Sequence, residues 1–108
     1  MGAPAPSPLS CEVQVSGDTA TVKCQGRILM DNAADLKQTV KPLIEQYRRI
    51  VLDLSGVDFL DSAGLGMLVS LKATAASTDR CSLELTNLSP RLKELLETTK
   101  LSQLFNFQ

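Results

Sequence analysis

Four short segments of this 108-residue chain alternate apolar and polar residues with a period of two. Such alternation is typical of a β-strand that buries one face and leaves the other in water. The segments are Glu12–Val15, Thr19–Gly26, Arg49–Ser55 and Cys81–Thr86. A sheet covered by helices on both faces would instead need strands that are apolar almost throughout. The pattern therefore predicts a sheet with helices mainly on one face.

The segment between the second and third strands has apolar residues at helical spacing, from Leu36 to Tyr47. Asp31 or Asn32 is a suitable N-cap for this helix, because its side-chain oxygen can accept a hydrogen bond from an early backbone N–H. Pro42 lies within the helical stripe and cannot donate the i→i−4 hydrogen bond. We therefore expect Pro42 to kink the helix or to split it.

Two further helices are expected later in the chain. One runs from Leu65 to Ala76, and the other follows the N-cap Ser89 with Pro90 at its first position. The last apolar residues, from Leu101 to Phe107, are expected to form a short helix packed on the sheet.

The element order is thus β-β-α-β-α-β-α, with a tight turn at residues 16–18 between the first two strands. Crossovers between parallel strands are right-handed, so a sheet that follows the chain order carries both crossover helices on the same face. We predict an α/β fold of two layers with a mixed sheet of four to five strands. Residues 1–10, which include three prolines, are expected to be a disordered tail, and residues 11–108 a single domain.

Charge and hydropathy argue against two classes of partner. Eleven basic and twelve acidic residues give a net charge of -1, and no basic block or stripe occurs, so a nucleic-acid partner is not expected. No apolar run approaches the ~20 residues of a membrane-spanning helix, so a membrane partner is not expected either.

The residue types for catalysis are also scarce. The chain has no histidine, which removes Ser-His-Asp catalysis and histidine-ligated metal sites. Gly64 and Gly66 match neither of the common glycine motifs that bind phosphate groups. Asp53, Asp58 and Asp61 could hold magnesium, but such residues are more often solvated charges and helix caps. We expect no metal, no cofactor and no enzymatic activity.

Cys11, Cys24 and Cys81 are an odd set without the spacing of a metal or redox motif. Cys24 and Cys81 fall on apolar strand faces, which favours a role as small buried hydrophobic residues. Reduced thiols are typical of a cytoplasmic protein.

Ser62 lies between the third strand and the second helix, within residues 61–66, Asp-Ser-Ala-Gly-Leu-Gly. Unpaired backbone N–H groups and the positive end of the helix dipole meet at such a junction, which suits an anionic group. The Ser62 hydroxyl could also cap the helix. Gly64 and Gly66 would leave the first turn open to another protein. Because the nearby chain offers little with which to run a reaction, we interpret Ser62 as a residue that is itself modified.

Residues 51–66 resemble the signature of STAS domains, which occur in anti-sigma factor antagonists and in the tails of sulfate transporters. The similarity extends over about Cys11 to Phe107 and includes the helix entry Asn87–Pro90. Its core, Asp-Ser-x-Gly-Leu-Gly after a strand, is quite specific. The resemblance implies a small mixed sheet with helices mainly on one face, in agreement with the strand alternation.

The resemblance also implies a function. Antagonists of this family are phosphorylated, at the serine that corresponds to Ser62, by a cognate anti-sigma factor that is also a serine kinase. The unphosphorylated antagonist binds the anti-sigma factor and frees the sigma factor for transcription, and a serine phosphatase resets it. The chain is then a monomer or weak dimer. The residues expected to contact the partner are Leu29, Met30, Asp31, Asp58, Asp61, Ser62, Ala63, Gly64, Leu65 and Gly66.

The loop before the first helix departs from the family pattern. Antagonists often carry an acidic pair after the position of Gly26, whereas here Arg27 is followed by Ile28, Leu29 and Met30. Because the strand is expected to end near Gly26, we interpret this apolar trio as an exposed patch that contacts the partner.

Two other functions are compatible with the resemblance. One is a scaffold of a stressosome-like assembly, in which phosphorylation controls the release of a bound kinase. The other is an adaptor in a lipid or anion transporter that contacts an ATPase subunit, although members of that group often lack the phosphorylatable serine.

Overall fold

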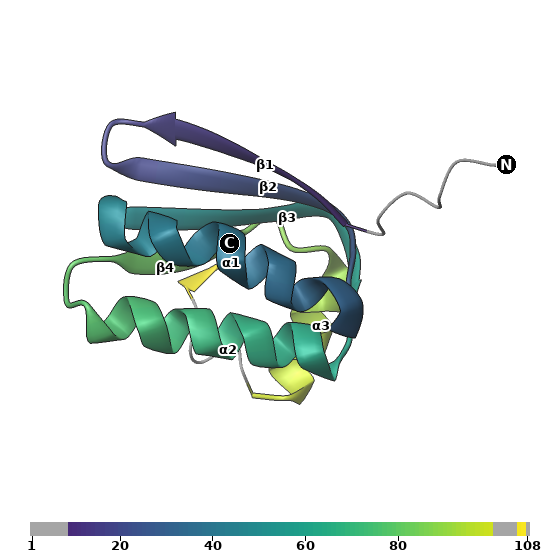
Figure 1. Ribbon diagram of the computed structural model, residues 1–108. Helices are drawn as coiled ribbons and strands as arrows, with labels where there is room; N and C mark the ends of the chain where they lie inside the picture. The colour runs from purple at the N-terminus through teal and green to yellow at the C-terminus, as the bar shows by residue number, and fades with distance from the viewer. Residues whose placement is uncertain (1–8, 101–105, 108) are drawn as a thin grey trace, which may run out of the picture.

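The computed structural model describes residues 9–100 and 106–107. Five strands form one mixed sheet whose order follows the chain (Figure 1). The first pair of strands is antiparallel, and the other neighbouring strands are parallel. The strands are β1 (Leu9–Ser16), β2 (Thr19–Ile28), β3 (Arg49–Leu60), β4 (Ser82–Thr86) and β5 (Asn106–Phe107).

Three helices connect the parallel strands. They are α1 (Met30–Gln46), α2 (Ser62–Ser77) and α3 (Pro90–Thr98). Helices α1 and α2 lie side by side on one face of the sheet (Figure 1). Helix α3 joins β4 to β5 and packs against β3. The predicted two-layer α/β fold is therefore confirmed. None of the helices in the described part of the chain is long and apolar enough to cross a membrane.

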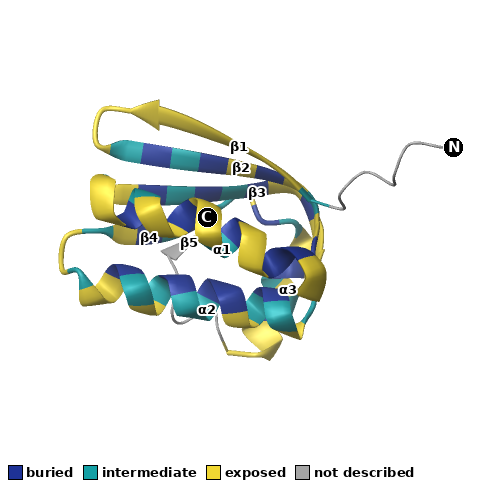
Figure 2. Ribbon diagram, viewed as in Figure 1, coloured by how far each residue is buried: buried dark blue, intermediate teal, exposed yellow. Residues whose placement is uncertain are grey.

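The hydrophobic core lies between the sheet and the helices. In β2, β3 and β4 the residues that point toward the helices are buried, and the alternate residues are mostly exposed or half-buried (Figure 2). The predicted alternation of these strands is thus confirmed. The largest side chains that are fully buried are Ile28, Leu36, Ile50, Leu52, Leu54, Leu60, Leu68, Leu71, Leu83, Leu85, Leu92 and Leu96.

Strand β1 is more exposed than its sequence pattern predicts (Figure 2). Val13 and Val15 are 40% and 51% exposed, although their partners in β2, Val22 and Ala20, are completely buried. The reason is topological. The crossover helices begin only after β2, so α1 and α2 pack on β2, β3 and β4 and leave most of the edge strand after Leu9 in solvent.

The start of α1 differs from the prediction, because β2 continues to Ile28 and the helix begins at Met30. The N-cap position belongs to Leu29, and neither Asp31 nor Asn32 occupies it. Asn32 is instead buried in the first turn. Its Oδ1 accepts a hydrogen bond from the Leu29 N–H at 2.9 Å, and its Nδ2 donates to the Arg27 carbonyl at 3.0 Å. Asn32 therefore fixes the bend between strand and helix.

Helix α1 is continuous through Pro42, so of the two predicted outcomes, a kink or a split, the split is wrong. A proline removes one backbone hydrogen bond. The rest of the helix is anchored in the core by Leu36, Val40 and Ile44, which are almost completely buried.

The entry to α3 matches its prediction. Ser89 is the N-cap, its Oγ accepts a hydrogen bond from the Leu92 N–H at 3.2 Å, and Pro90 follows at the first helical position. At the C-terminus, residues 101–105 of the expected short helix lie outside the described residues. Asn106–Phe107 form a strand parallel to β4, so the helix prediction is wrong there. The predicted tail also lies outside the described residues up to residue 8, and β1 begins at Leu9.

Candidate functional site

Ser62 is exposed and is the first residue of α2. The N-cap is the preceding residue, Asp61, whose Oδ1 accepts a hydrogen bond from the Gly64 N–H at 2.9 Å. The interpretation of Ser62 as the cap is therefore wrong. Within the part of the chain that the structure describes, the Ser62 hydroxyl has no hydrogen-bond partner. It faces solvent at the positive end of the α2 dipole.

Asp61 also joins the starts of two helices. Its second carboxylate oxygen, Oδ2, accepts a hydrogen bond of 2.9 Å from the Met30 N–H at the beginning of α1. Its backbone N–H donates to the carbonyl of Ile28, at the end of β2, over 3.2 Å. The junction between β2 and α1 is thus held directly against the junction between β3 and α2.

Gly64 allows this close approach. A Cβ atom on Gly64 would lie 2.8 Å from the carbonyl oxygen of Ile28 and 3.1 Å from its Cγ2. Gly64 is buried, which removes it from the surface that a partner can touch. Gly66 is different, because it is exposed and a Cβ there would have no neighbour within 4 Å. The two glycines of the motif therefore have separate structural roles.

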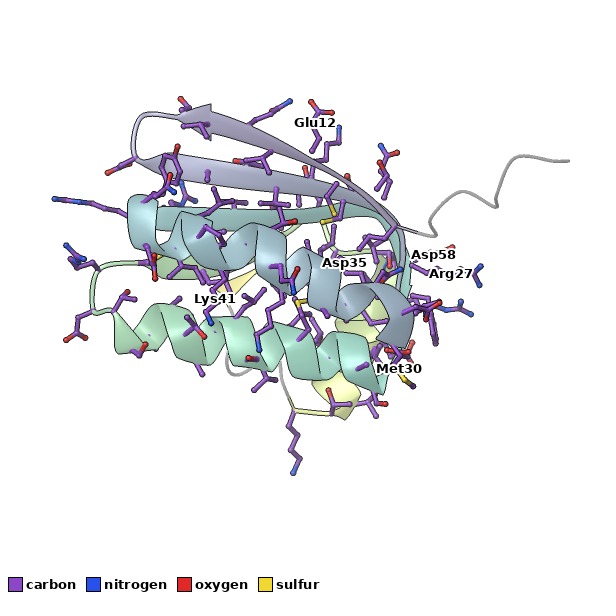
Figure 3. The ribbon with its side chains drawn as sticks, in the orientation of Figure 1. Glu12, Arg27, Met30, Asp35, Lys41 and Asp58 are labelled. Carbon is purple, nitrogen blue, oxygen red and sulfur yellow. The ribbon has the colours of Figure 1, made fainter. Side chains whose placement is uncertain are left out.

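The remaining predicted partner residues lie at one end of the molecule, where α1 and α2 begin and β3 ends (Figure 1). Figure 3 shows Met30, Arg27 and Asp58 at this end. The exposed residues of the set are Met30, Asp31, Asp58, Ser62 and Gly66, and the half-buried ones are Leu29, Asp61, Ala63 and Leu65.

The predicted apolar patch before α1 is only partly present. Ile28 is completely buried in the core and pairs with Leu60 of β3, so its assignment to an exposed patch is wrong. Leu29 is half-buried, whereas Met30 is 76% exposed. Gly26 has a φ of 115°, a backbone conformation that favours glycine, and it lies beside a register shift in the β2–β3 pairing. The strand passes through this irregularity and continues to Ile28.

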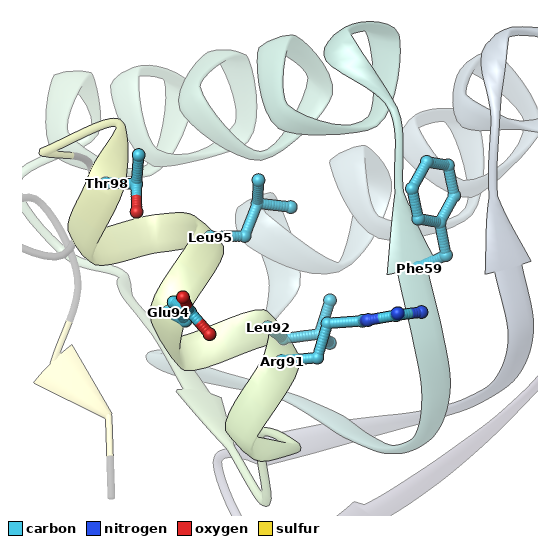
Figure 4. A pocket seen from close by; sticks show the side chains of 6 residues that line it. All are labelled: Phe59, Arg91, Leu92, Glu94, Leu95 and Thr98. Atoms are coloured by element: carbon cyan, nitrogen blue, oxygen red, sulfur yellow. The ribbon is translucent and has the colours of Figure 1, made fainter.

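Phe59 belongs to the same end of the molecule and is missing from the predicted set. Its side chain is 42% exposed, close to the end of β3. Together with Arg91, Leu92 and Leu95 of α3 it lines a hollow of about 410 Å³ (Figure 4). An apolar residue in a strand is ordinarily assigned to the core. The sequence feature that could have indicated a role for Phe59 at the site is its position in the signature, three residues before Ser62.

The three carboxylates considered as a magnesium site have separate environments. Asp61 is the helix cap, and Asp58 is exposed. Burial raises the pKa of Asp53, but hydrogen bonds from Ser55 and Asn87 and the charge of Lys23 outweigh it and lower the pKa overall. Among the described residues, no group of three or more His, Cys, Asp or Glu side chains is placed to hold a metal ion.

The chain is similar to known proteins over most of its length. A family model described as "Mlab, STAS domain" matches residues 11–106. A STAS-domain containing protein of Pseudomonas aeruginosa is 32% identical over 89 residues, which are 82% of this chain and 87% of the relative. The anti-sigma-B factor antagonist of Bacillus subtilis is 30% identical over 98 residues, which are 91% of this chain and 89% of the relative.

Solved structures share the fold at lower identity. An anti-sigma factor antagonist from Mycobacterium paratuberculosis has a TM-score of 0.80 and 24% identity, covering 95% of this chain and 87% of its own. The Bacillus cell fate determinant SpoIIAA in its phosphorylated form has a TM-score of 0.72 and 14% identity, covering 92% of this chain and 91% of its own.

Proposed function

The chain belongs to the STAS domain family, and on this basis we propose that it acts as an anti-sigma factor antagonist switched at Ser62. The unphosphorylated form binds a cognate anti-sigma factor that is also a serine kinase, and phosphorylation of Ser62 ends the binding. The similarity to an antagonist of Bacillus subtilis over nearly the whole chain supports this function. The observation that carries the proposal is the exposed Ser62 hydroxyl at the start of α2, with Asp61 capping that helix in its place.

The fold can accept a phosphate at this position. A phosphoserine carries a charge of about −1.5 to −2 and three strong acceptor oxygens. At the first residue of α2, this charge would meet the positive end of the helix dipole and would stay in water. The neighbouring carboxylates of Asp58 and Asp61 oppose it. Because the two effects have opposite signs, phosphorylation changes the stability of the domain little.

Partner binding would respond more strongly than stability. The exposed side chains of Met30 and Phe59 offer apolar contact area near Ser62. A partner that covers them also removes water from the Ser62 hydroxyl. A doubly charged phosphate would lose its hydration in that interface, which is costly unless a new cation pairs with it. The modification therefore weakens a complex that the free hydroxyl permits.

The test compares wild type with variants at the two ends of α2. Wild type and Ser62→Ala are incubated with ATP and the serine kinase encoded in the same genome as this chain, and phosphate is mapped by mass spectrometry. Ser77→Ala is the matched control, because Ser77 is also exposed but lies at the C-terminal end of α2. Wild type and Ser77→Ala should each gain one phosphate at Ser62, and Ser62→Ala none. Phosphate at another residue would contradict the proposal.

Binding is measured with the same kinase in the absence of ATP. Ser62→Asp should bind at least about tenfold more weakly than wild type, a difference of about 1.4 kcal/mol, while Ser77→Asp should bind as wild type does. A stressosome-like scaffold predicts a large homo-assembly instead. Light scattering separates the two, because we expect a monomer or weak dimer that forms a small complex with the kinase.

A transporter adaptor is the second candidate, because the description of the matching family model names no antagonist and the same fold occurs in an anion transporter, murine Slc26a9. This function requires a stable complex with a transporter ATPase subunit that is insensitive to Ser62→Asp. Capture of such a subunit by wild type and Ser62→Asp alike would favour the adaptor over the antagonist.

A further inference from the structure

Two of the three cysteines lie opposite each other in the sheet. Cys11 of β1 and Cys24 of β2 are direct cross-strand partners, and their Sγ atoms are 3.5 Å apart. Both are free thiols. Their separation of 13 residues matches no redox motif, but the hairpin folds the chain back and brings the two side chains together.

The hairpin places these cysteines where a disulfide can form. Ser16 and Thr19 flank a two-residue turn that starts at Gly17 with φ of 59°, and such a turn is closed by a hydrogen-bonded residue pair. Because pair types alternate along an antiparallel ladder, Cys11 and Cys24 form a pair without backbone hydrogen bonds, in which side chains are closest. The Cα atoms of such pairs are about 4.5 Å apart, within the range that disulfides accept.

The bond requires little movement. Disulfide sulfurs are about 2.05 Å apart, so the two Sγ atoms must approach by about 1.5 Å. Rotation of the exposed Cys11 side chain about its Cα–Cβ bond can supply this approach while the ladder between β1 and β2 stays intact. Cys24, which is completely buried, can remain in place.

The two thiols differ in access and acidity. Cys11 is exposed and lines a hollow of about 180 Å³ between β1 and α1, together with Leu9 and Asp35. The hydrogen bond with Cys24 lowers the pKa of Cys11, against the smaller opposing effect of burial. The same hydrogen bond, followed by burial, raises the pKa of Cys24. The thiolate is the reactive form, so Cys11 is the thiol that meets a small oxidant and attacks it first.

We propose that Cys11 and Cys24 form a peroxide-oxidised thiol pair, in which Cys11 reacts and Cys24 resolves. The Cys11 thiolate attacks one oxygen of hydrogen peroxide; an S–O bond forms, the O–O bond breaks, and hydroxide leaves and is protonated to water. The Cys24 sulfur then attacks the sulfenic sulfur of Cys11. An S–S bond forms, the S–O bond breaks, and the hydroxyl group leaves with the Cys24 proton as a second water. Two thiols are oxidised and one peroxide is reduced.

The disulfide would fasten the edge strand β1, most of which the helices leave exposed, to its neighbour β2. Strand β2 ends at Ile28, whose carbonyl accepts the hydrogen bond from Asp61.

Cys81 lies immediately before β4, and β2 and β3 separate that strand from β1. Burial raises the pKa of Cys81, although its side chain is only half-buried and not buried as the sequence predicts. It is therefore an internal control for unspecific oxidation.

The test treats the reduced full-length protein with a small excess of hydrogen peroxide and then alkylates it in denaturant. Wild type and Cys81→Ser should each lose the mass of two hydrogen atoms, with Cys11 and Cys24 protected from alkylation and joined in one peptide pair. Cys11→Ser should show no such link. Thiols that all remain alkylatable, or a link between two chains, would overturn the proposal.

A second variant tests the order of the two steps. In Cys24→Ser the hydroxyl can keep a hydrogen bond to Cys11 but cannot resolve the sulfenic acid, so a dimedone adduct should accumulate on Cys11 at least about tenfold above wild type. In Cys11→Ser the buried Cys24 should give no adduct. An adduct on Cys24 equal to that on Cys11 would show that the assigned order is wrong. Circular dichroism of both variants before oxidation shows whether they are folded.

Discussion

The carboxylate of Asp61 accepts a 2.9 Å hydrogen bond from the backbone N–H of Met30, a residue 31 positions earlier in the chain. The other oxygen of the same carboxylate caps α2 through Gly64. One side chain therefore satisfies an early N–H group of each of two helices. It also brings the exposed Met30 into the surface around Ser62, so the candidate site consists of two segments that are distant in sequence.

Replacing Asp61 should separate these segments. Asp61→Ala removes both acceptors, and loss of an N-cap alone costs about 0.5–2 kcal/mol of stability. We expect the free energy of unfolding in urea to fall by about 2 kcal/mol, because the Met30 N–H also loses its partner. Asp61→Asn keeps one acceptor oxygen and should cost less than half as much. If Asp61→Ala costs only a few tenths of a kcal/mol, the bridge between the helices contributes little.

The two motif glycines should respond oppositely to the same substitution. Gly64→Ala places a Cβ 2.8 Å from the Ile28 carbonyl oxygen, and such overpacking typically costs about 1–3 kcal/mol. Gly66→Ala meets no atom within 4 Å, and alanine in a helix is favoured over glycine by about 1 kcal/mol. Thermal unfolding of both variants measures the difference. Equal destabilisation would show that the first turn of α2 is packed differently.

The exposed apolar side chains should matter for the partner and not for the fold. Met30→Ser and Phe59→Ala remove side chains that are 76% and 42% exposed. Calorimetric titration with the kinase should show a loss of affinity of about tenfold or more for each, since a few apolar anchors dominate most interfaces. Unfolding free energies should change by about 0.5 kcal/mol for Met30→Ser, and by somewhat more for the partly packed Phe59.

Val15→Thr is the control for this surface. Val15 is 51% exposed and lies on the edge strand β1, away from the end of the molecule that carries Ser62. Its replacement should leave affinity for the kinase unchanged. A loss of affinity as large as that of Met30→Ser would move the contact surface from the helix starts to the edge of the sheet.

The sequence predicted those features that depend on local pattern. Alternation in β2 and β4 predicted which residues are buried, and the Ser89–Pro90 pair predicted the start of α3. Features that depend on which strands lie next to each other in the sheet could not be predicted from the local pattern. The pattern of Val13 and Val15 does not show that β1 lies at the edge of the sheet, beyond the reach of the helices.

The errors at the site have a similar origin. Aspartate and serine both make good N-caps, so their adjacent positions did not reveal that Asp61 caps α2 and leaves the Ser62 hydroxyl exposed. The burial of Ile28 depends on β2 continuing past Gly26 beside β3, which is a property of the sheet. The pairing of Cys11 with Cys24 likewise follows from the register of the hairpin and not from the spacing of the cysteines.

The open face of the sheet provides a test of pH dependence. Arg49 of β3 and Glu84 of β4 form a two-pronged ion pair, with Nε–Oε2 and Nη2–Oε1 distances of 2.5 and 3.0 Å. The hydrogen bond from Arg49 lowers the pKa of Glu84 below its ordinary value, against a smaller effect of burial. As the pH falls, the unfolded chain therefore takes up this proton before the folded chain does. The ion pair stabilises the fold above the ordinary glutamate pKa of about 4.3. That contribution is lost as the pH falls through the lower pKa of the folded state.

Glu84→Gln isolates this contribution, because glutamine keeps the shape of the side chain without its charge. Wild type should be more stable than Glu84→Gln at pH 7, and the difference between them should disappear as the pH falls well below about 4. Urea unfolding of both proteins at several pH values measures it. We expect the difference to be modest even at pH 7, because the side chains are 52% and 27% exposed and solvent screens their attraction. A difference that is the same at pH 7 and pH 3 would mean that packing of the Glu84 side chain, and not its charge, stabilises the sheet.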